Sequence, residues 1–305
     1  MFDKILVPLD GSKEAERALG PAVALAQPVG AVLLLLRSVV PAAMLVPDLA
    51  GEYVWGWAEK AEQEERQAAL AYLETIQQEW ARPPARLSGR IEVGDEASLI
   101  VDTAAGEGAD LIVTSPKGDG GLFHWSLDSV TERVLHSASC PVLVVRSAEP
   151  ITRILITLDG SHLAEMALGP GLEVARRLGA HVTLLRVNHP ALHSDESVQL
   201  DWVEGRTGGT LARVHDGAQS YLEETARRYA AGGPAGREIK TVVLDGRAAD
   251  RILHYAAEHP IDLIVMATHG RTGLQRWLYG SVTSKVLHNA HCSLLIVRPP
   301  ADALK

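Results

Sequence analysis

The sequence predicts an α/β protein built from two tandem, doubly wound sheets, each of five parallel strands. The first observation is an internal repeat, because Lys4–Ser12 (KILVPLDGS) matches Arg153–Ser161 (RILITLDGS) 149 residues later. The second is that residues 110–146 align with 262–298 without a gap and share 19 of 37 positions. The third is that each copy alternates apolar runs with helical patterns, which is typical of a parallel sheet with helical crossovers.

Each copy supplies the same elements in the same order. In the first copy we expect strands over 4–9, 32–37, 87–93, 110–114 and 142–146, and helices over 13–27, 58–81, 96–106 and 129–137. Leu33–Leu36 and Leu263–Met266 are apolar throughout, as strands of a parallel sheet are when both of its faces are covered. The helix over 58–81 has one apolar face of Ala69, Leu73, Ile76 and Trp80. Its counterpart over 209–231 has Leu211, Val214, Ala218, Leu222 and Tyr229.

The repeat divides the chain into two domains. We expect the first domain over residues 1–148 and the second over 152–300, joined by a short polar segment that contains Pro150. A length of 305 residues is enough for two domains that each bury a core of their own.

Composition excludes several classes of function. The net charge of -9 argues against general nucleic-acid binding, which depends on clustered Lys and Arg. Two cysteines without a CxxC pair predict neither a disulfide framework nor structural zinc. His136 and His288 occupy equivalent helical positions, so we expect a shared packing role and no metal site. The N-terminus lacks a signal-peptide pattern and the most apolar stretch contains Pro28, Arg37 and Pro41, so we expect a cytoplasmic protein without a membrane span.

Three segments of the second copy are expected to meet at the carboxyl edge of its sheet, where doubly wound folds bind ligands. They are the strand ends Thr157–Ser161 and Leu185–Val187, and the segment Met266–Val282 that leads into the last helix. Gly270 and Gly273 allow close approach of a phosphate, and Gly280-Ser281 begins the helix. The structural alternative is a flexible loop that ends in a serine N-cap.

The spacing of this segment resembles a family motif. Ala267-x2-Gly270-x9-Gly280-Ser281 is similar to the G-x2-G-x9-G-[ST] motif of ATP-binding universal stress proteins, the UspA family, with the first glycine replaced by alanine. The flanking sequences Thr-His-Gly-Arg-Thr-Gly-Leu and Gly-Ser-Val-Thr also resemble that pattern. The resemblance covers essentially the whole chain. It implies a Rossmann-like fold of the adenine-nucleotide α-hydrolase type in each copy, and ATP, with or without Mg²⁺, as the ligand of the second.

The resemblance also implies roles for single residues. Asp159 would lie beside the ribose and adenine, and Val187 would offer backbone groups to the adenine edge. The residues expected around the phosphates are Ala267, Gly270, Gly280, Ser281 and the adjoining Val282, with Arg271, Thr272 and Gly273 closing over them.

The first copy departs from the motif and is expected to be a degenerate site. Asp10, Gly118 and Ser129 remain, but Asp128 stands at the position of Gly280. A carboxylate there would repel a phosphate, although Asp is also a favoured N-cap. The other replacements are Ser115 for Ala267, Pro116 for Thr268 and Ser38 for Val187. We therefore expect no tight binding of ATP by this copy.

The resemblance further predicts how the two copies assemble. Dimers of the family pair their last strands across a two-fold axis, and here both strands, Val142–Val145 and Leu294–Val297, lie in one chain. We therefore expect an intrachain pseudo-dimer, and a homodimer of the whole chain stays open.

Three functions are compatible with these features. The first is a regulatory, ATP-binding protein of the stress response without catalytic residues. The second is a slow ATPase or an autophosphorylating enzyme, and the third is a dimerisation scaffold without a ligand. The sequence has no G-x-S-x-G elbow and no GxxxxGK[ST] P-loop, and no general base or Mg²⁺ carboxylate pair is evident beside the glycine-containing segment. These absences favour the first function.

Overall fold

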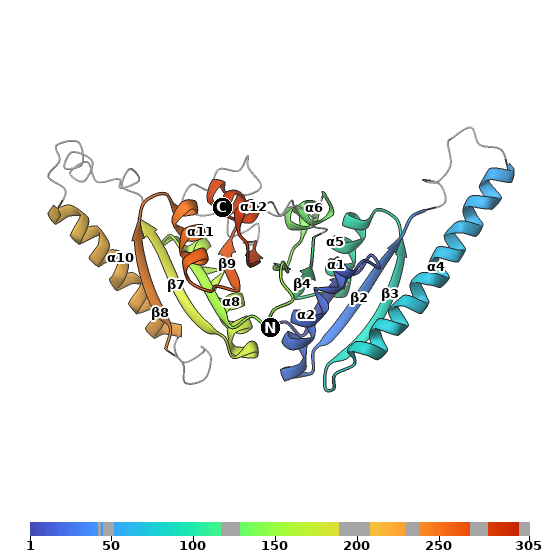
Figure 1. Cartoon of the computed structure of the whole chain (residues 1–305), viewed down its shortest axis with the longest axis horizontal. Helices are drawn as coiled ribbons and strands as arrows, with labels where there is room; N and C mark the ends of the chain where they lie inside the picture. The colour runs from blue at the N-terminus through green and yellow to red at the C-terminus, as the bar shows by residue number, and fades with distance from the viewer. Residues whose placement is uncertain are drawn as a thin grey trace. The chain divides into compact units, whose positions relative to one another are not determined.

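The chain folds into two compact units (Figure 1). The structure is a computed structural model, and it describes residues 1–41, 52–116, 129–188, 208–229, 238–268 and 280–298, together with Met44. Within these residues the division between the units falls between Ala148 and Glu149. Each unit has its own five-stranded parallel sheet, which confirms the predicted α/β class and the tandem repeat. The pairing of the units through their last strands stays a prediction.

The first unit has the strand order β3-β2-β1-β4-β5, and all neighbouring strands in it are parallel. Its elements are β1 (Lys4–Pro8), α1 (Lys13–Glu16), α2 (Leu19–Ala26), the 3-10 helix η1 (Gln27–Val29), β2 (Val32–Val39), α4 (Glu52–Trp80), β3 (Arg86–Val93), α5 (Glu96–Glu107), β4 (Leu111–Thr114), α6 (Ser129–Ser137) and β5 (Val142–Val144).

The second unit repeats this order as β8-β7-β6-β9-β10, again with parallel neighbours. Its elements are β6 (Arg153–Leu158), α7 (His162–Glu165), α8 (Leu168–Leu178), β7 (His181–Asn188), α10 (Gly208–Tyr229), β8 (Lys240–Asp245), α11 (Ala248–Glu258), β9 (Leu263–Ala267), α12 (Ser281–Asn289) and β10 (Ser293–Val297).

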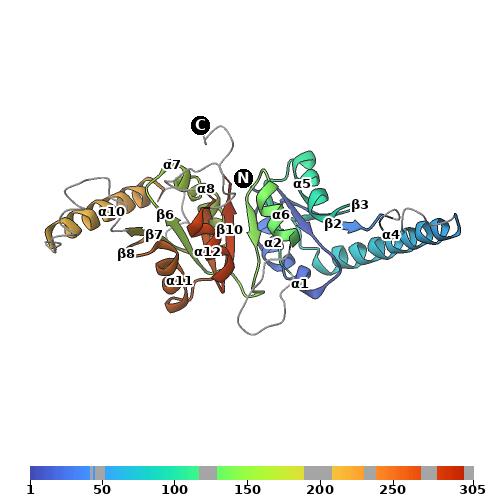
Figure 2. The ribbon, with the colours of Figure 1, turned by 90° about the horizontal axis from the view of Figure 1, so that it is seen from above.

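Helices cover both faces of each sheet. In the second unit α10 and α11 both pack on β7 and β8, and Figure 2 shows them on opposite sides of these strands. All five residues of β9 are buried, as are all four of β4, because central strands have a helical layer on each side. The order of the strands reverses between β6 and β9, and doubly wound sheets bind their ligands in the crevice outside the carboxyl ends of the strands at such a reversal.

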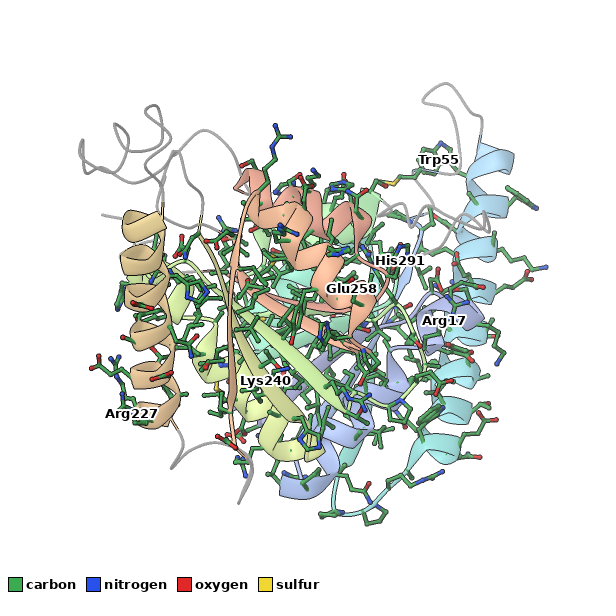
Figure 3. The ribbon with its side chains drawn as sticks, turned by 60° about the vertical axis from the view of Figure 1, so that its left-hand side comes forward. Arg17, Trp55, Arg227, Lys240, Glu258 and His291 are labelled. Atoms are coloured by element: carbon green, nitrogen blue, oxygen red, sulfur yellow. The ribbon has the colours of Figure 1, made fainter. Side chains whose placement is uncertain are left out.

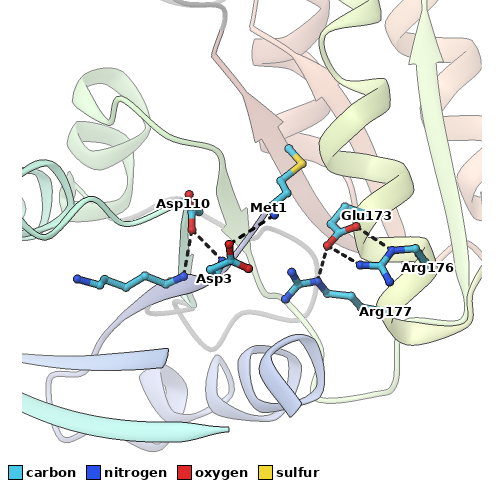
Figure 4. Close-up of polar contacts among 7 residues, drawn as sticks. Met1, Asp3, Asp110, Glu173, Arg176 and Arg177 are labelled. Atoms are coloured by element: carbon cyan, nitrogen blue, oxygen red, sulfur yellow. Dashed lines mark hydrogen bonds and ion pairs between the residues drawn. The ribbon is translucent and has the colours of Figure 1, made fainter. Parts of the chain in front are cut away.

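At the opposite, amino edge of each sheet, one aspartate carboxylate accepts hydrogen bonds from the backbone at the start of a neighbouring strand. The Asp110 carboxylate accepts hydrogen bonds from the backbone N–H groups of Asp3 (2.8 Å) and Lys4 (3.0 Å), as Figure 4 shows. Asp262 does the same in the second unit with Thr152 (2.7 Å) and Arg153 (2.9 Å). The contact joins the starts of two neighbouring strands and satisfies amides that the sheet leaves unpaired.

A buried ion pair holds α8 together. The Arg177 side chain is 1% exposed and donates to the Glu173 carboxylate over 2.7 Å, and Arg176 donates to the same group (Figure 4). Burial alone would raise the pKa of Glu173, but the two guanidinium groups outweigh it and hold this pKa below its usual range.

Two helix predictions need correction. The helix expected over 13–27 is two helices, α1 and α2, followed by η1. Pro21 has no N–H to donate to the carbonyl of Arg17, and Arg17 and Ala18 form tighter bonds to residues three positions earlier. The helix expected over 58–81 begins at Glu52, where aromatic residues of modest helix propensity hide the pattern.

The apolar faces of the two long helices follow the sequence pattern. Ala69, Leu73 and Ile76 of α4 are buried, whereas Trp80 is half-buried. Ala218 and Leu222 of α10 are buried, and Arg227 lies on its outward side (Figure 3). None of the helices in the described part of the chain combines the length and apolar character needed to span a bilayer.

Candidate functional site

The carboxyl ends of three strands bring the predicted site residues of the second unit to one edge. Leu158 of β6 is in register with Arg186 of β7, so Asp159 and Val187 follow paired positions. On the other side Ile156 is in register with Val265 of β9, which places Ala267 at the same edge. Because parallel strands end together, Asp159, Val187 and Ala267 surround the point where the strand order reverses.

The turn after β6 is held by its own side chains. The Asp159 carboxylate accepts a hydrogen bond from the Ser161 N–H over 2.9 Å, and the Ser161 hydroxyl accepts one from the Ala164 N–H over 3.1 Å at the start of α7. Gly160 between them has φ +84°, a left-handed conformation that favours glycine. This Asx turn fixes the direction in which Asp159 leaves the sheet.

The start of α12 is fastened directly to the end of β9. The Gly280 N–H donates to the Thr268 carbonyl over 2.9 Å, and the buried Thr283 hydroxyl donates to the Ala267 carbonyl over 3.0 Å. The first amides of a helix have no acceptor within the helix, and they carry the positive end of its dipole. Backbone donors are therefore concentrated within a few residues of the crevice, beside the half-buried Val282 and the exposed Ser281.

Gly280 differs from the glycine of the turn. Its backbone angles, φ -59° and ψ 152°, are open to any residue, and a Cβ added there would meet the Thr268 carbonyl oxygen at 3.5 Å, an ordinary contact. Neither backbone strain nor crowding by described residues requires a glycine at this position. A glycine at the start of α12 does leave the helix amides open to a ligand.

The Arg186 side chain lies close to Gly160 of this turn, a contact that the sequence analysis did not predict. A Cβ on Gly160 would lie 2.9 Å from an Arg186 guanidinium nitrogen, and the Arg186 Cζ lies 5.1 Å from the centre of the Tyr221 ring. The Tyr221 hydroxyl donates to the Glu165 carboxylate over 2.8 Å. Burial, with the neighbouring Glu165 carboxylate, raises the pKa of Tyr221 above its usual range.

The internal repeat could have predicted this group of contacts. Arg37, Tyr72 and Glu16 stand 149 positions before Arg186, Tyr221 and Glu165, and the Tyr72 hydroxyl donates to Glu16 over 3.2 Å. Identical residues at one offset in three separate elements identify a shared contact network.

Each unit also ties its last helix to the preceding one by an ion pair. In the second unit Lys285 of α12 pairs with Asp250 of α11, and the Lys285 ammonium holds the pKa of Asp250 below its usual range. In the first unit Arg133 of α6 donates to both carboxylate oxygens of Asp95, over 2.8 and 2.7 Å.

Several predicted residues fall outside the described part of the chain. They are Gly118, Asp128, Gly270, Arg271, Thr272 and Gly273. Among the described residues there is no group of three or more His, Cys, Asp or Glu side chains placed to bind a metal.

The expectation of a packing role for His288 is wrong, because His288 is exposed and its ring lies 2.7 Å from the Ser284 carbonyl oxygen of its own helix.

The first unit repeats the turn but not the opposite side of the crevice. Asp10 accepts from the Ser12 N–H over 2.9 Å, and Gly11 has φ +86°. Ser115, which follows β4, is 7% exposed, and its hydroxyl has no hydrogen-bond partner among the residues that the structure describes. Ser129, exposed, is the first residue of α6.

Comparison with known proteins places both units in one family. A model described as the universal stress protein family matches residues 1–146 and 150–298. A universal stress protein of Mycolicibacterium smegmatis is 26% identical over 304 residues, which cover 97% of each chain. Another from Methanocaldococcus jannaschii is 32% identical over 158 residues, 52% of this chain and 88% of its own.

A solved structure agrees on the fold. The crystal structure of a universal stress protein from Archaeoglobus fulgidus superposes with a TM-score of 0.65 at 18% identity, covering 98% of this chain and 99% of its own. The fold of nearly the whole chain is therefore matched by nearly the whole of a solved protein.

Proposed function

This chain belongs to the universal stress protein family, and from that premise we propose that its second unit binds one molecule of ATP and that the protein acts as a regulatory nucleotide-binding protein. The observation that carries the proposal is the hydrogen bond from the Gly280 N–H to the Thr268 carbonyl, 2.9 Å long. It brings the amide-rich start of α12 to the strand end that faces the Asp159 turn across the crevice.

The phosphates would lie at the start of α12. Free amides and the helix dipole attract an anion, and the absence of a side chain at Gly280 lets the phosphate oxygens approach the backbone. The Thr283 and Gly280 bonds to β9 keep these donors in place before the ligand arrives, so that little ordering is needed on binding.

The adenosine would lie across the strand ends. Asp159, fixed by the Ser161 N–H, is placed to accept hydrogen bonds from ribose hydroxyls, and the backbone at Val187 would meet the adenine edge. Ala267 has no bulk that would block the space between the two ends of the ligand. Mg²⁺ would reduce the charge of the phosphates.

Binding would be asymmetric between the units. Both units have the same Asp-Gly-Ser turn, so the adenosine end does not distinguish them. The sequence puts Asp128 directly before α6 in the first unit, where the second unit has Gly280. A like charge about 4 Å from a phosphate costs roughly 1–4 kcal/mol, so ATP would occupy the second unit first.

Equilibrium titration of the full chain with ATP, in the absence of magnesium, tests the proposal. We expect one tight site per chain, and nucleotide released by denaturing the purified protein should be identified by mass spectrometry. Two equal tight sites would contradict the asymmetry, and the absence of any ATP binding would contradict the proposal itself. Release of phosphate on incubation with ATP would instead support a slow ATPase.

A further inference from the structure

The two crevices differ in chemistry as well as in charge. Where the second unit has the apolar residues Val187 and Ala267, the first has hydroxyl groups, those of Ser38 and Ser115. Both changes fall at the carboxyl edge, since Ser38 lies near the end of β2 and Ser115 directly follows β4. At these two positions the first unit thus has hydroxyl groups where the second unit has apolar side chains.

The Ser115 hydroxyl is the most informative of these groups. It is 93% buried, and no residue in the described ranges donates to it or accepts from it. Leaving a buried hydroxyl unpaired costs about 1–3 kcal/mol, so such groups in folded proteins are nearly always satisfied by protein, water or ligand. Alanine stands at the equivalent position of the second unit, so the fold itself does not need this hydroxyl.

The rest of the adenosine end is preserved in the first unit. The Asp10 carboxylate accepts from the Ser12 N–H over 2.9 Å, the same distance as in the second unit, and the glycine between them has nearly the same φ. Tyr72 and Glu16 repeat the hydrogen bond of Tyr221 and Glu165. The carboxylate that would meet the ribose is therefore held in the same way in both units.

We propose that the first unit binds an uncharged nucleoside, with the Asp10 turn and the Ser115 hydroxyl as hydrogen-bonding groups. The inference rests on the proposed function for the position of the crevice and for the adenosine end. Asp128, one residue before α6, opposes a phosphate but not a neutral ligand. The protein would then hold two different ligands of one chemical class, a nucleotide in one unit and a nucleoside in the other.

The binding experiment uses the full chain saturated with ATP in magnesium-free buffer, so that the second crevice is filled. Adenosine is then added as the probe, and its binding is measured by equilibrium dialysis. We expect one adenosine per chain, with an affinity that Ser115→Ala weakens about tenfold through the loss of one hydrogen bond. Ser139→Ala, at an exposed serine of the same unit that precedes β5 at the amino edge of the sheet, is the control and should leave adenosine binding unchanged.

A second measurement separates a ligand contact from a structural one. In ligand-free protein Ser115→Ala removes an unpaired hydroxyl, so the midpoint of urea unfolding should stay the same or rise. A lower midpoint would show that the hydroxyl has a structural partner, and would overturn the inference.

The outcomes distinguish this inference from the proposed function. If ATP binds once per chain but adenosine does not bind to the ATP-saturated protein, the inference is wrong and the proposed function stands. If ATP fails to bind at all, the proposed function fails, and adenosine binding that Ser115→Ala weakens would still support the first site. Displacement of this adenosine by further ATP would overturn the inference.

Discussion

Replacing Gly280 by aspartate gives the sharpest test of where the phosphates bind. The backbone at Gly280 has φ -59° and ψ 152°, and an added Cβ would lie 3.5 Å from the Thr268 carbonyl oxygen. The fold should therefore accept the side chain without strain. Aspartate is also a better helix N-cap than glycine by a few tenths of a kcal/mol, so the free energy of unfolding should stay the same or rise slightly.

Gly280→Asp should weaken ATP binding, and the change in binding free energy should be larger than the change in the free energy of unfolding. A carboxylate about 4 Å from a phosphate costs roughly 1 kcal/mol if the site is as well screened as water, and about 4 kcal/mol at the effective dielectric of a protein surface. These energies correspond to a loss of affinity between roughly fivefold and almost a thousandfold. The carboxylate would also accept hydrogen bonds from the helix amides that the phosphate needs.

Calorimetric titration of ATP into Gly280→Asp and Gly280→Asn separates charge from shape. Asparagine has almost the same size and also caps a helix, so it should lose less affinity than aspartate. Urea unfolding of both variants checks that they are folded. A folded Gly280→Asp variant that binds ATP as well as the original protein would refute the placement of the phosphates at α12.

Four further predictions concern the framework of the two units and their pairing. Thr283→Val removes the hydrogen bond to the Ala267 carbonyl and should lower the free energy of unfolding by about 1–2 kcal/mol in urea titration; no change would show that this bond does not hold α12. Gly160→Ala should destabilise by about 1–2 kcal/mol because of its positive φ and the nearby Arg186, whereas Gly169→Ala, in an open helical position, should stabilise; equal effects would contradict the strain. Arg133 holds the pKa of Asp95 well below its usual range, so Asp95 stabilises the fold above the unfolded pKa of about 3.9 and this contribution is lost as pH falls toward the folded pKa. Asp95→Asn should therefore cost about 0.5 kcal/mol near neutral pH, with a difference from the original protein that shrinks in acid; a difference independent of pH would exclude the ion pair as its cause. Finally, cysteines introduced at Leu143 and Leu295 or adjoining positions should form a disulfide within one chain if β5 and β10 pair, and failure in every register would contradict the pseudo-dimer.

The sequence pattern predicted most of the fold because burial repeats along each element. Apolar runs such as Leu263–Met266, which alternate with helical patterns, predicted buried strands, and the offsets of 149 and 152 showed that the second half copies the first. Where one local rule competes with another, the pattern was less reliable. The apolar spacing over 13–27 is helical throughout, but Pro21 removes one donor and divides the segment into two helices.

For the candidate site, the sequence determined which residues make up the site in each copy and in which order they follow one another. Comparison of the two copies identifies the Asp-Gly-Ser turns, the glycine before α12 and the substitutions in the first copy. The sequence also predicted their common edge, because parallel strands of a doubly wound sheet end on the same side.

Only the tertiary structure decided how these residues are held. The Gly280 bond to Thr268, the position of Arg186 between Gly160 and Tyr221, and the unpaired hydroxyl of Ser115 each depend on groups from different elements. Periodicity records whether a side chain faces the core, but it does not record which partner it meets there. Such contacts are fixed by the packing of segments that are distant in the chain, and their distances follow from the whole unit rather than from any local stretch of sequence.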